Sequence, residues 1–261
     1  MKKNYPLALF LLLCLSLFIS CSDDDNNDDS NGSVKLLLQK LTATDNSFEM
    51  RYHYDAQNRI VKMEEDEKED GIDITIYEYN SENNPVKKVE SYTDDSDTYL
   101  TTYTYKDDSI FVKMFEINSQ TKVSTIDTLT IDNKGCLKKI HSSYGSYIAY
   151  STYTYNNAAQ LTQSDYYNRS EDYETNGTDT YSYDNKKGYF SHVNVKPWFI
   201  NYELDIYRHT NVSNSSLITN SSSHKDLKTG ETQTSTSKTE LTYTYNEDGY
   251  PITMSEKIHI W

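Results

Sequence analysis

The sequence predicts an all-β protein: a large antiparallel meander of hairpin repeats, curled into a barrel-like or flattened closed sheet. Three observations support this prediction. A motif with two tyrosines recurs along the chain, the residues around it alternate with period two, and helical periodicity is nearly absent. The chain has 25 tyrosines among 261 residues. Because tyrosine buries its ring while its hydroxyl stays hydrated or paired, it can supply the core that scarce aliphatic residues do not.

Residues 1–20 have the pattern of a secretory signal peptide. Two lysines precede an apolar run, residues 7–19, that is too short to span a bilayer as a helix. The run leads into the letters FISC, which resemble the lipobox of bacterial lipoproteins, with Phe18 where leucine is usual. This resemblance implies cleavage before Cys21 and lipid attachment to it. The alternative is an ordinary signal peptide that happens to contain Cys21.

Residues 21–33 are predicted to form an acidic, disordered tether, since they contain nothing to bury. Ser22, Asp23, Asp24 and Asp25 resemble the acidic export signal of Bacteroidetes surface lipoproteins, which sends them to the outer leaflet of the outer membrane. A plain spacer is the alternative, and the two roles are compatible. We therefore expect an outer-membrane lipoprotein exposed at the cell surface.

The charge of the chain argues against nucleic acid as a partner. Loss of residues 1–20 removes two lysines and no acid, so the formal charge of −15 becomes −17, which repels phosphate backbones. Acidic clusters at 64–70 and 94–97 are predicted at solvated hairpin tips. Neither has the ligand spacing of a calcium loop, and the sequence predicts no metal and no cofactor. Cys136 is expected to be a small buried side chain.

The repeated unit is Tyr-x-Tyr-Asp/Asn, about three turn residues, and a short apolar run. Its second aromatic position is spaced by 25, 26, 26, 24, 28 and 62 residues along the chain. The last gap is interpreted as two diverged units. These anchor positions are Tyr54, Tyr79, Tyr105, Ile131, Tyr155, Tyr183 and Tyr245.

Each part of the unit has a physical reason. Tyrosines two apart share one face of a strand, and the following Asp or Asn can fold its side chain onto the next amides to start a turn. The fourth residue after the anchor is expected to be left-handed; it is Asn58, Asn83, Gly135 or Gly249 in four units. Ala159 and Lys187 suit this position less well, so we expect those turns to differ. Pro85 and Pro251 start return strands.

Residues 34–261 form the predicted β domain, with about 14 to 18 strands, more than an open twisted sheet usually sustains without curling. Lys87 and Lys88 are adjacent in a predicted strand and must point to opposite faces. In a membrane-spanning barrel one of them would face lipid, at about 2 to 4 kcal/mol near the midplane. We therefore expect the sheet to lie in water.

Two segments interrupt the pattern. Residues 188–207 are predicted to form a crossing loop with a helical turn, and they carry Trp198, Phe199 and Tyr202. These three residues are candidates for ligand binding, because loops on rigid scaffolds collect binding residues and flat rings suit sugar faces. The alternative is that this loop plugs an open end of the sheet. Residues 210–239 are predicted to form either a polar hairpin or a partly disordered segment.

The repeats resemble the YD repeat of large shell-forming bacterial proteins, although only Arg59 keeps the arginine of that motif. They are more similar to a family of Bacteroidetes surface lipoproteins of unknown function. The stretch YSYDNKKGYFSHVNVKPWF, residues 181–199, is similar to a late segment of that family. This resemblance implies a porin-like curved antiparallel sheet and assigns no catalytic residue.

No reaction is indicated by the remaining residues. The six histidines are isolated, and the sequence has no zinc-type cysteine pair, phosphate-binding glycine loop or nucleophile elbow. Ser109 and Thr128 lie in stretches that resemble the short O-glycosylation sequon of the Bacteroidetes. We expect no enzyme but a surface binding module for a glycan or a protein. The alternative is a structural or accessory component of an outer-membrane complex.

Overall fold

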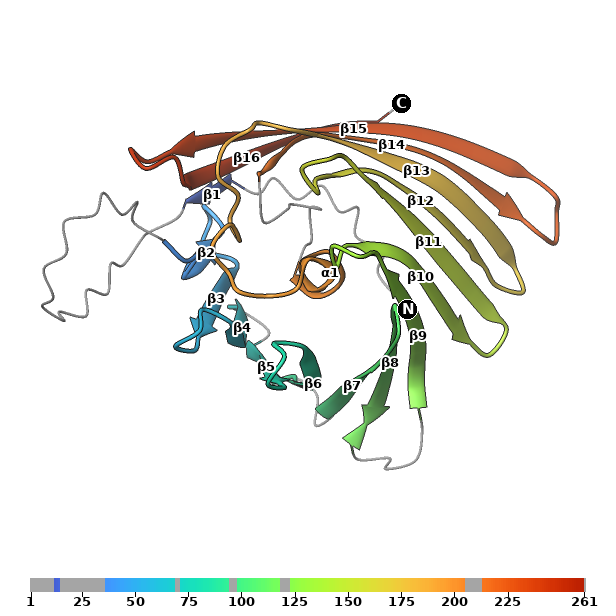
Figure 1. The fold of residues 1–261 in the computed structure, drawn as a ribbon. Coiled ribbons are helices and arrows are strands. Elements are labelled where there is room, and N and C mark those ends of the chain that lie inside the picture. The colour runs from blue at the N-terminus through green and yellow to red at the C-terminus, as the bar shows by residue number, and fades with distance from the viewer. Residues whose placement is uncertain are drawn as a thin grey trace, which may run out of the picture.

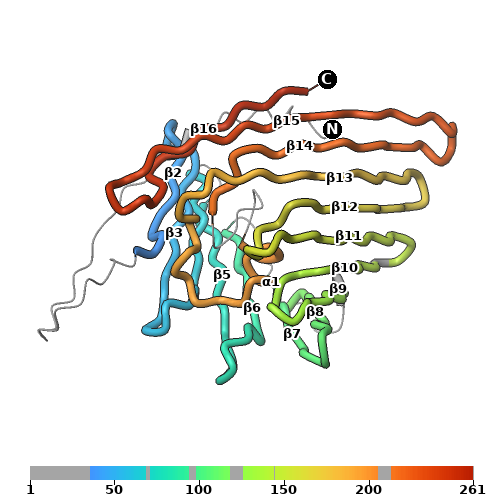
Figure 2. The backbone as a smooth tube through the Cα atoms, turned by 45° about the horizontal axis from the view of Figure 1, so that its top comes forward, coloured from blue at the N-terminus to red at the C-terminus, as the bar shows by residue number. Residues whose placement is uncertain are grey.

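The structure, a computed structural model, describes residues 36–68, 71–93, 98–117, 123–204 and 213–260, and the backbone of 12–14. In these residues sixteen strands form one antiparallel sheet, in which β2 to β16 follow one another in chain order (Figures 1 and 2). The all-β meander is therefore confirmed. The strands are β1 (Leu12–Cys14), β2 (Lys40–Thr42), β3 (Glu49–Tyr54), β4 (Ile60–Glu67), β5 (Gly71–Tyr79), β6 (Pro85–Ser91), β7 (Thr98–Lys106), β8 (Ser109–Glu116), β9 (Val123–Ile131), β10 (Leu137–Tyr144), β11 (Tyr147–Tyr155), β12 (Leu161–Arg169), β13 (Tyr173–Tyr183), β14 (Ser215–Asp226), β15 (Thr232–Tyr245) and β16 (Pro251–Ile260).

The sheet curls on itself, but hydrogen bonds do not close it. β1 pairs with β16, with Leu13 opposite Met254. β1 also comes within 8 Å of β2 between Cα atoms without forming a ladder with it. β1 belongs to the predicted signal peptide. Removal of that peptide would leave this part of the β16 edge unpaired.

The turns follow the repeated motif. In each of four units the Asp or Asn after the anchor accepts hydrogen bonds from the second and fourth following amides, as Asn80 does from Glu82 and Asn84 at 3.0 Å. The other three are Asp55, Asp132 and Asn156. The predicted role of this side chain in starting the turn is confirmed.

The left-handed position is also confirmed, with φ angles of 62° at Asn58 and 77° at Gly135. Ala159 adopts a φ of 60° in the same position, so the expectation that its turn differs is wrong. The side chain of Asn156 holds that turn in the common shape despite the cost of placing alanine there. The turn with Lys187 does differ, because its left-handed residue is Asn185, with a φ of 59°.

Tyrosine hydroxyls connect one repeat to the next at β-bulges. Opposite His53 and Tyr54 the register shifts, leaving Val61 of β4 without a partner. The hydroxyl of Tyr79, on the next strand, donates a 2.8 Å hydrogen bond to the carbonyl of Ile60, directly before that bulge. The same arrangement recurs three times. Its other donors and acceptors are Tyr105 with Pro85, Tyr183 with Leu161, and Tyr243 with Ser215.

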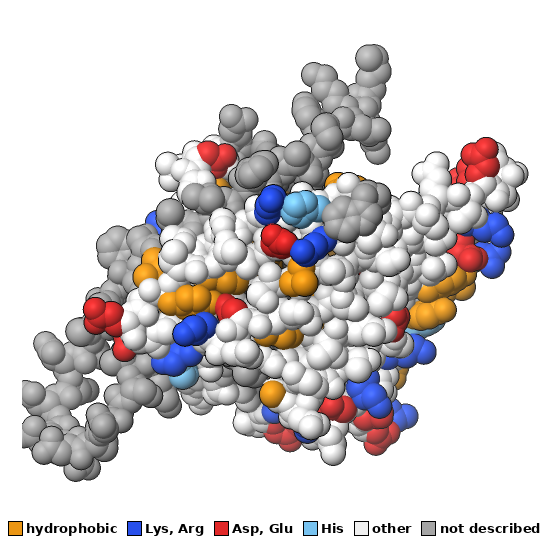
Figure 3. All heavy atoms as spheres, turned by 90° about the horizontal axis from the view of Figure 1, so that it is seen from above, with side chains coloured by type: hydrophobic (Ala, Val, Ile, Leu, Met, Phe, Trp, Pro, Cys, Tyr) orange, Lys and Arg blue, Asp and Glu red, His pale blue; other side chains and the backbone are white. Residues whose placement is uncertain are grey.

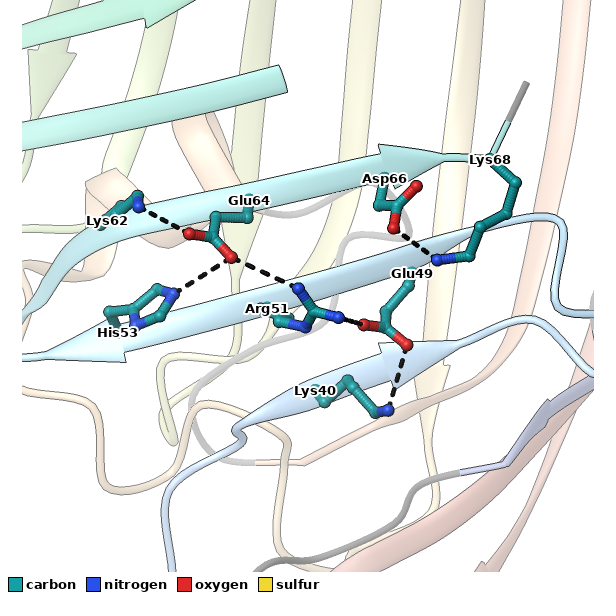
Figure 4. A network of polar contacts seen from close by, with 8 residues as sticks. All are labelled: Lys40, Glu49, Arg51, His53, Lys62, Glu64, Asp66 and Lys68. Atoms are coloured by element: carbon teal, nitrogen blue, oxygen red, sulfur yellow. Dashed lines mark hydrogen bonds and ion pairs between the residues drawn. The ribbon is translucent and has the colours of Figure 1, made fainter. Parts of the chain in front are cut away.

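Much of the outer face of the sheet is polar. Over the strands nearest the C-terminus, uncharged polar side chains and backbone predominate (Figure 3). On β3 and β4, Glu64 forms ion pairs with Lys62 and Arg51 and lies 3.6 Å from the imidazole of His53 (Figure 4). The predicted hairpin tip at 64–70 is wrong for residues 64–67, because they belong to β4. Their side chains point alternately to the two faces of the sheet. Glu64 and Asp66 share one face, where they pair with lysine and arginine side chains. Residues 94–97 lie outside the described residues.

The gap of 62 residues between the last two anchors does not hold two diverged units. In its described residues, 184–204 and 213–244, the gap holds the hairpin of β14 and β15, preceded by a segment inside the sheet. The interpretation as two units is wrong, because one stretch as long as a hairpin lies inside the sheet and adds no strands to it. The polar hairpin expected within 210–239 is confirmed, with its turn between Asp226 and Thr232.

We predict that Tyr79→Phe lowers the free energy of unfolding by about 1 to 3 kcal/mol, because the carbonyl of Ile60 loses its hydroxyl donor. Tyr79→Ala should cost about 3 to 5 kcal/mol through the lost ring. Thr154→Ala, on the exposed face, should change it by less than about 0.5 kcal/mol. Urea unfolding of the variants measures all three. A phenylalanine variant as stable as the parent would show that the hydroxyl contributes nothing.

A second prediction concerns the strained turn. Ala159→Gly should raise the free energy of unfolding by about 0.5 to 1 kcal/mol, since the relief of left-handed strain exceeds the added flexibility of glycine. Ala158→Gly is the matched control, because Ala158 has no positive φ; it should lower stability slightly. If both glycine variants lose stability equally, the left-handed strain at Ala159 is not significant.

Candidate functional site

The interior of the curled sheet holds a stretch of the chain that we call the inner segment, residues 188–204. It contains the short helix α1 (Pro197–Phe199) and the π-helical turn η2 (Ile200–Leu204). Figure 1 shows α1 within the curve of the sheet. The predicted crossing loop with a helical turn is therefore confirmed for residues 188–204, and residues 205–207 lie outside the described residues. Trp198 and Phe199 are 1% and 0% exposed.

The aromatic side chains of the inner segment pack against the tyrosine motif. Phe199 meets Tyr77 edge-on, with ring centroids 5.1 Å apart. Trp198 lies 5.9 Å from Tyr103 and 6.4 Å from Tyr105. Edge-to-face pairs at these separations stabilise beyond the area they bury. The first tyrosine of a unit and its anchor thus build one aromatic core with the inner segment.

Backbone and amide groups of the turns fix the position of the inner segment. The amide of Asn194 donates to the carbonyl of Asn58 at 2.9 Å, and the side chain of Asn83 donates to Asn194 at 3.0 Å. The amide of Trp198 donates to the carbonyl of Gly135 at 2.9 Å. Asn58, Asn83 and Gly135 are the left-handed turn residues of their units. The same residue that shapes each turn therefore also holds the inner segment.

Glu203 is the centre of a buried charge network. Its side chain is 5% exposed and accepts a 2.9 Å hydrogen bond from Lys88 and another from the hydroxyl of Tyr103. Burial alone would lower the pKa of Lys88, but the carboxylates of Glu203 and Glu90 outweigh burial and raise it. Lys88 therefore stays charged and neutralises Glu203. Lys87 points outward to Glu78, as the alternation of the strand predicts.

Two further polar contacts tie η2 to the sheet. The hydroxyl of Tyr202 donates a 2.6 Å hydrogen bond to Asp127 on β9. Burial and this carboxylate raise the pKa of Tyr202 well above its usual range. The side chain of Asn201 donates to the hydroxyl of Tyr155 on β11 at 3.2 Å. Side chains on β6, β7, β9 and β11 thus hold successive residues of η2.

The structure brings together the three residues predicted for ligand binding, Trp198, Phe199 and Tyr202. In this conformation Trp198 and Phe199 offer no exposed ring to a ligand, which matches the alternative prediction of a plug; ligand binding by these residues stays a prediction. Neither Glu203 nor Asp127 stands out in the sequence. The inward register of Lys88 was the available signal, since a buried lysine needs an anionic partner.

Several predicted sites lie outside the described residues: Cys21, Ser22, Asp23, Asp24 and Asp25. Cys136 is buried, and burial raises the pKa of its thiol to about 11, as befits a small core side chain. Within the described residues, no helix is long and apolar enough to cross a membrane. In the same part of the chain, no three His, Cys, Asp or Glu side chains come together in a group that could hold a metal ion.

We predict that Trp198→Ala lowers the free energy of unfolding by about 3 to 5 kcal/mol, because it leaves a cavity between the inner segment and the tyrosines. Tyr150→Ala, which removes a ring 42% exposed on the outer face, should cost far less. Chemical denaturation of both variants measures the difference. A Trp198→Ala variant that keeps its stability but loses retention on a glycan array would support a ligand-binding role instead.

Comparisons with known proteins give weak likenesses. No protein-family model matches the sequence, and no curated protein matches it. Among solved structures, a porin-like protein from Bacteroides vulgatus aligns with a TM-score of 0.36 and 13% identity, over 82% of this chain and 92% of that one. A porin-like protein from Bacteroides uniformis gives 0.35 and 15%, over 82% and 96%. TcdB2-TccC3 gives 0.33 and 10%, over 85% of this chain and 12% of that one. Likenesses this low say nothing about the activity of this chain.

Proposed function

We propose that this chain is a lipid-anchored, cell-surface binding module that catalyses no reaction. The observation that carries the proposal is the division of the inner face. The inner segment fills the end of the curled sheet next to the tyrosine-containing turns, while β12 to β15 continue past α1 (Figure 1). Polar side chains such as Ser222 and Ser235, which share a 2.9 Å hydrogen bond, face inward there. A rigid sheet with an inward polar surface suits recognition of a glycan or a protein.

The anchor is supported by the sequence. The lipobox-like letters before Cys21 and the acidic run at 22–25 lead into a tether, residues 21–33, and then into the β domain. Such an arrangement holds a folded domain away from a membrane surface on a flexible connection. The excess of negative charge disfavours nucleic acid as a partner.

The absence of catalysis is supported by the state of the buried ionisable groups. Lys88 and Tyr103 donate hydrogen bonds to Glu203, and Tyr202 donates one to Asp127. These contacts tie the inner segment to the sheet, so we assign these groups a structural role; the second carboxylate oxygen of Asp127 is buried without a hydrogen-bond partner among the described residues. Oligosaccharides incubated with the protein should accordingly be recovered uncleaved.

The proposal predicts lipid labelling at Cys21 and exposure on intact cells. A palmitate analogue should label the parent and Cys136→Ala, its matched control, but not Cys21→Ala. Protease added to intact cells should cleave the parent, whereas replacement of Asp23, Asp24 and Asp25 by Ala should protect it. Label that persists in Cys21→Ala contradicts the anchor, and unchanged cleavage of the aspartate variant contradicts the export role.

Binding itself is tested on the same cells. Cells that carry the parent chain should retain a labelled soluble glycan, or cross-link to a surface protein, in larger amounts than cells that lack the chain. If neither amount increases, the binding function is wrong, whatever the result for the anchor.

A structural role in an outer-membrane complex is the second candidate. One observation favours it: an apolar row crosses the outer face of β5 to β8, where Ile76, Val89, Leu100 and Phe115 lie opposite one another in succession. Ile76 is 44% exposed. Apolar rows on a solvated face often mark protein contacts. Co-purification with an envelope complex that Val89→Glu abolishes would favour this candidate over glycan binding.

A further inference from the structure

We propose that the inner face of β12 to β15 binds a neutral oligosaccharide, stacked on the ring of Tyr166. This inference rests on the proposed binding function and assigns it a site and a ligand class. It depends on how Tyr166 lies on the sheet and on the side chains around it.

Tyr166 lies flat across the neighbouring strand. It belongs to β12 and stands opposite Gly177 of β13. Its hydroxyl accepts a 3.2 Å hydrogen bond from the side chain of Asn220, which belongs to β14. Because adjacent strands are about 4.8 Å apart, a ring that reaches from β12 to a residue on β14 must lie along the sheet. One face of the ring therefore rests on β13, and the other is turned toward the interior of the curled sheet.

Gly177 makes this position of the ring possible. A Cβ atom at residue 177 would lie 2.4 Å from the hydroxyl oxygen of Tyr166, 2.5 Å from the ring carbon that bears it and 2.9 Å from the carbonyl oxygen of Ser221. Any other residue would lift the ring off the strand and crowd the carbonyl of Ser221 on β14. Glycine inside a strand weakens it and often marks a close approach of another group. The flat ring is thus a reason for a glycine at this position, although glycine weakens β13.

Hydrogen bonds hold the surroundings of the ring in place. Asn220 also donates to Asp179 at 2.7 Å, and so it bridges Tyr166 and that carboxylate. Beyond Gly177, Ser222 and Ser235 continue the same row across β14 and β15. Tyr166 and Ser222 are half-buried, and Ser235 is exposed. A flat ring bordered by ordered amide, carboxylate and hydroxyl groups matches a sugar, which presents an apolar face and a rim of hydroxyls.

The charge of this surface selects the class of sugar. The rows through Ser164, Tyr166 and Asn168 place Ser, Thr, Asn, Gln, Asp, His, Gly and one Tyr on the inner face of β12 to β15, and no Lys or Arg. Arg169 and Lys225 fall on the opposite face, in the alternate register. A uronate or sulfated sugar would find no fixed cation, and the acidic chain would repel it. The ligand is therefore a neutral glycan.

The chain contains a matched control for the site. Tyr167 is the next residue along β12 and points to the outer face, where it stacks on Tyr150 with ring centroids 4.9 Å apart. Both Tyr166 and Tyr167 are half-buried. A general loss of strand stability affects both alanine variants, whereas a loss of ligand affects Tyr166→Ala alone.

The test uses the full-length protein in detergent, with cellohexaose, xylohexaose, mannohexaose and maltohexaose as neutral probes and an oligogalacturonate hexamer as the acidic probe. Calorimetric titration should show binding of at least one neutral probe and none of the acidic one. Tyr166→Ala should weaken that binding by about tenfold or more, the loss of one stacking partner, and Tyr167→Ala by less than about twofold. Gly177→Val should weaken it as Tyr166→Ala does, because it lifts the ring.

A second variant guards against misfolding of Tyr166→Ala. Ser222→Arg leaves the contact of Tyr166 with Gly177 intact and fills the surface beside the ring, so it should abolish binding with an unchanged near-ultraviolet circular dichroism spectrum. Equal affinities of Tyr166→Ala and the parent overturn the site and leave the binding function standing. A parent that cross-links to a surface protein but binds none of the neutral probes overturns the glycan class alone. If the parent protein binds none of the probes and cross-links to no surface protein, both the glycan site and the binding function are wrong.

Discussion

The hydrogen bond from a tyrosine hydroxyl to a carbonyl beside a bulge is the interaction on which the rest of this fold depends. Each bulge leaves one residue of the return strand unpaired and bends the strand, as at Val61. The next strand then supplies a hydroxyl to the carbonyl before the bulge, as Tyr79 does for Ile60. One repeat therefore produces curvature and the following repeat secures it. Phenylalanine would fill the same volume but remove the hydroxyl that donates to this buried carbonyl, which is a reason for tyrosine at these positions.

The same tyrosines determine what the curved sheet must enclose. Their rings gather on the inner face near the turns, and a curl lined with half-exposed rings is unstable in water unless another apolar group covers it. Phe199 and Trp198 provide that cover. The pair of Lys88 and Glu203 adds specificity, because either charge would be costly if the inner segment settled in another register. The aromatic contacts supply stability, and the charge pair selects one placement.

Local features of the fold could be predicted from sequence, and contacts between distant residues could not. The face of each tyrosine, the side-chain cap of the turn and the left-handed residue all depend on a few neighbouring residues. Lys88 and Glu203 are 115 positions apart, and no local pattern relates them. Ala159 was misjudged because the cap from Asn156 overrides its own preference. The flat position of Tyr166 follows from a register between strands, in which Gly177 is ordinary until it stands opposite a tyrosine.

The two ends of the inner face serve different needs although they share the same strands. Tyr153 is buried near the turns, while Ser151, two residues along the same face of β11, stands opposite Tyr166. The aromatic end must keep its apolar rings for the sheet to fold, since it forms the core. The polar end adds little buried apolar area, so its side chains can vary at small cost to stability. Gly177 at that tolerant end makes room for the flat ring of Tyr166 and for the carbonyl of Ser221, and the proposed recognition of a ligand would give that ring a function.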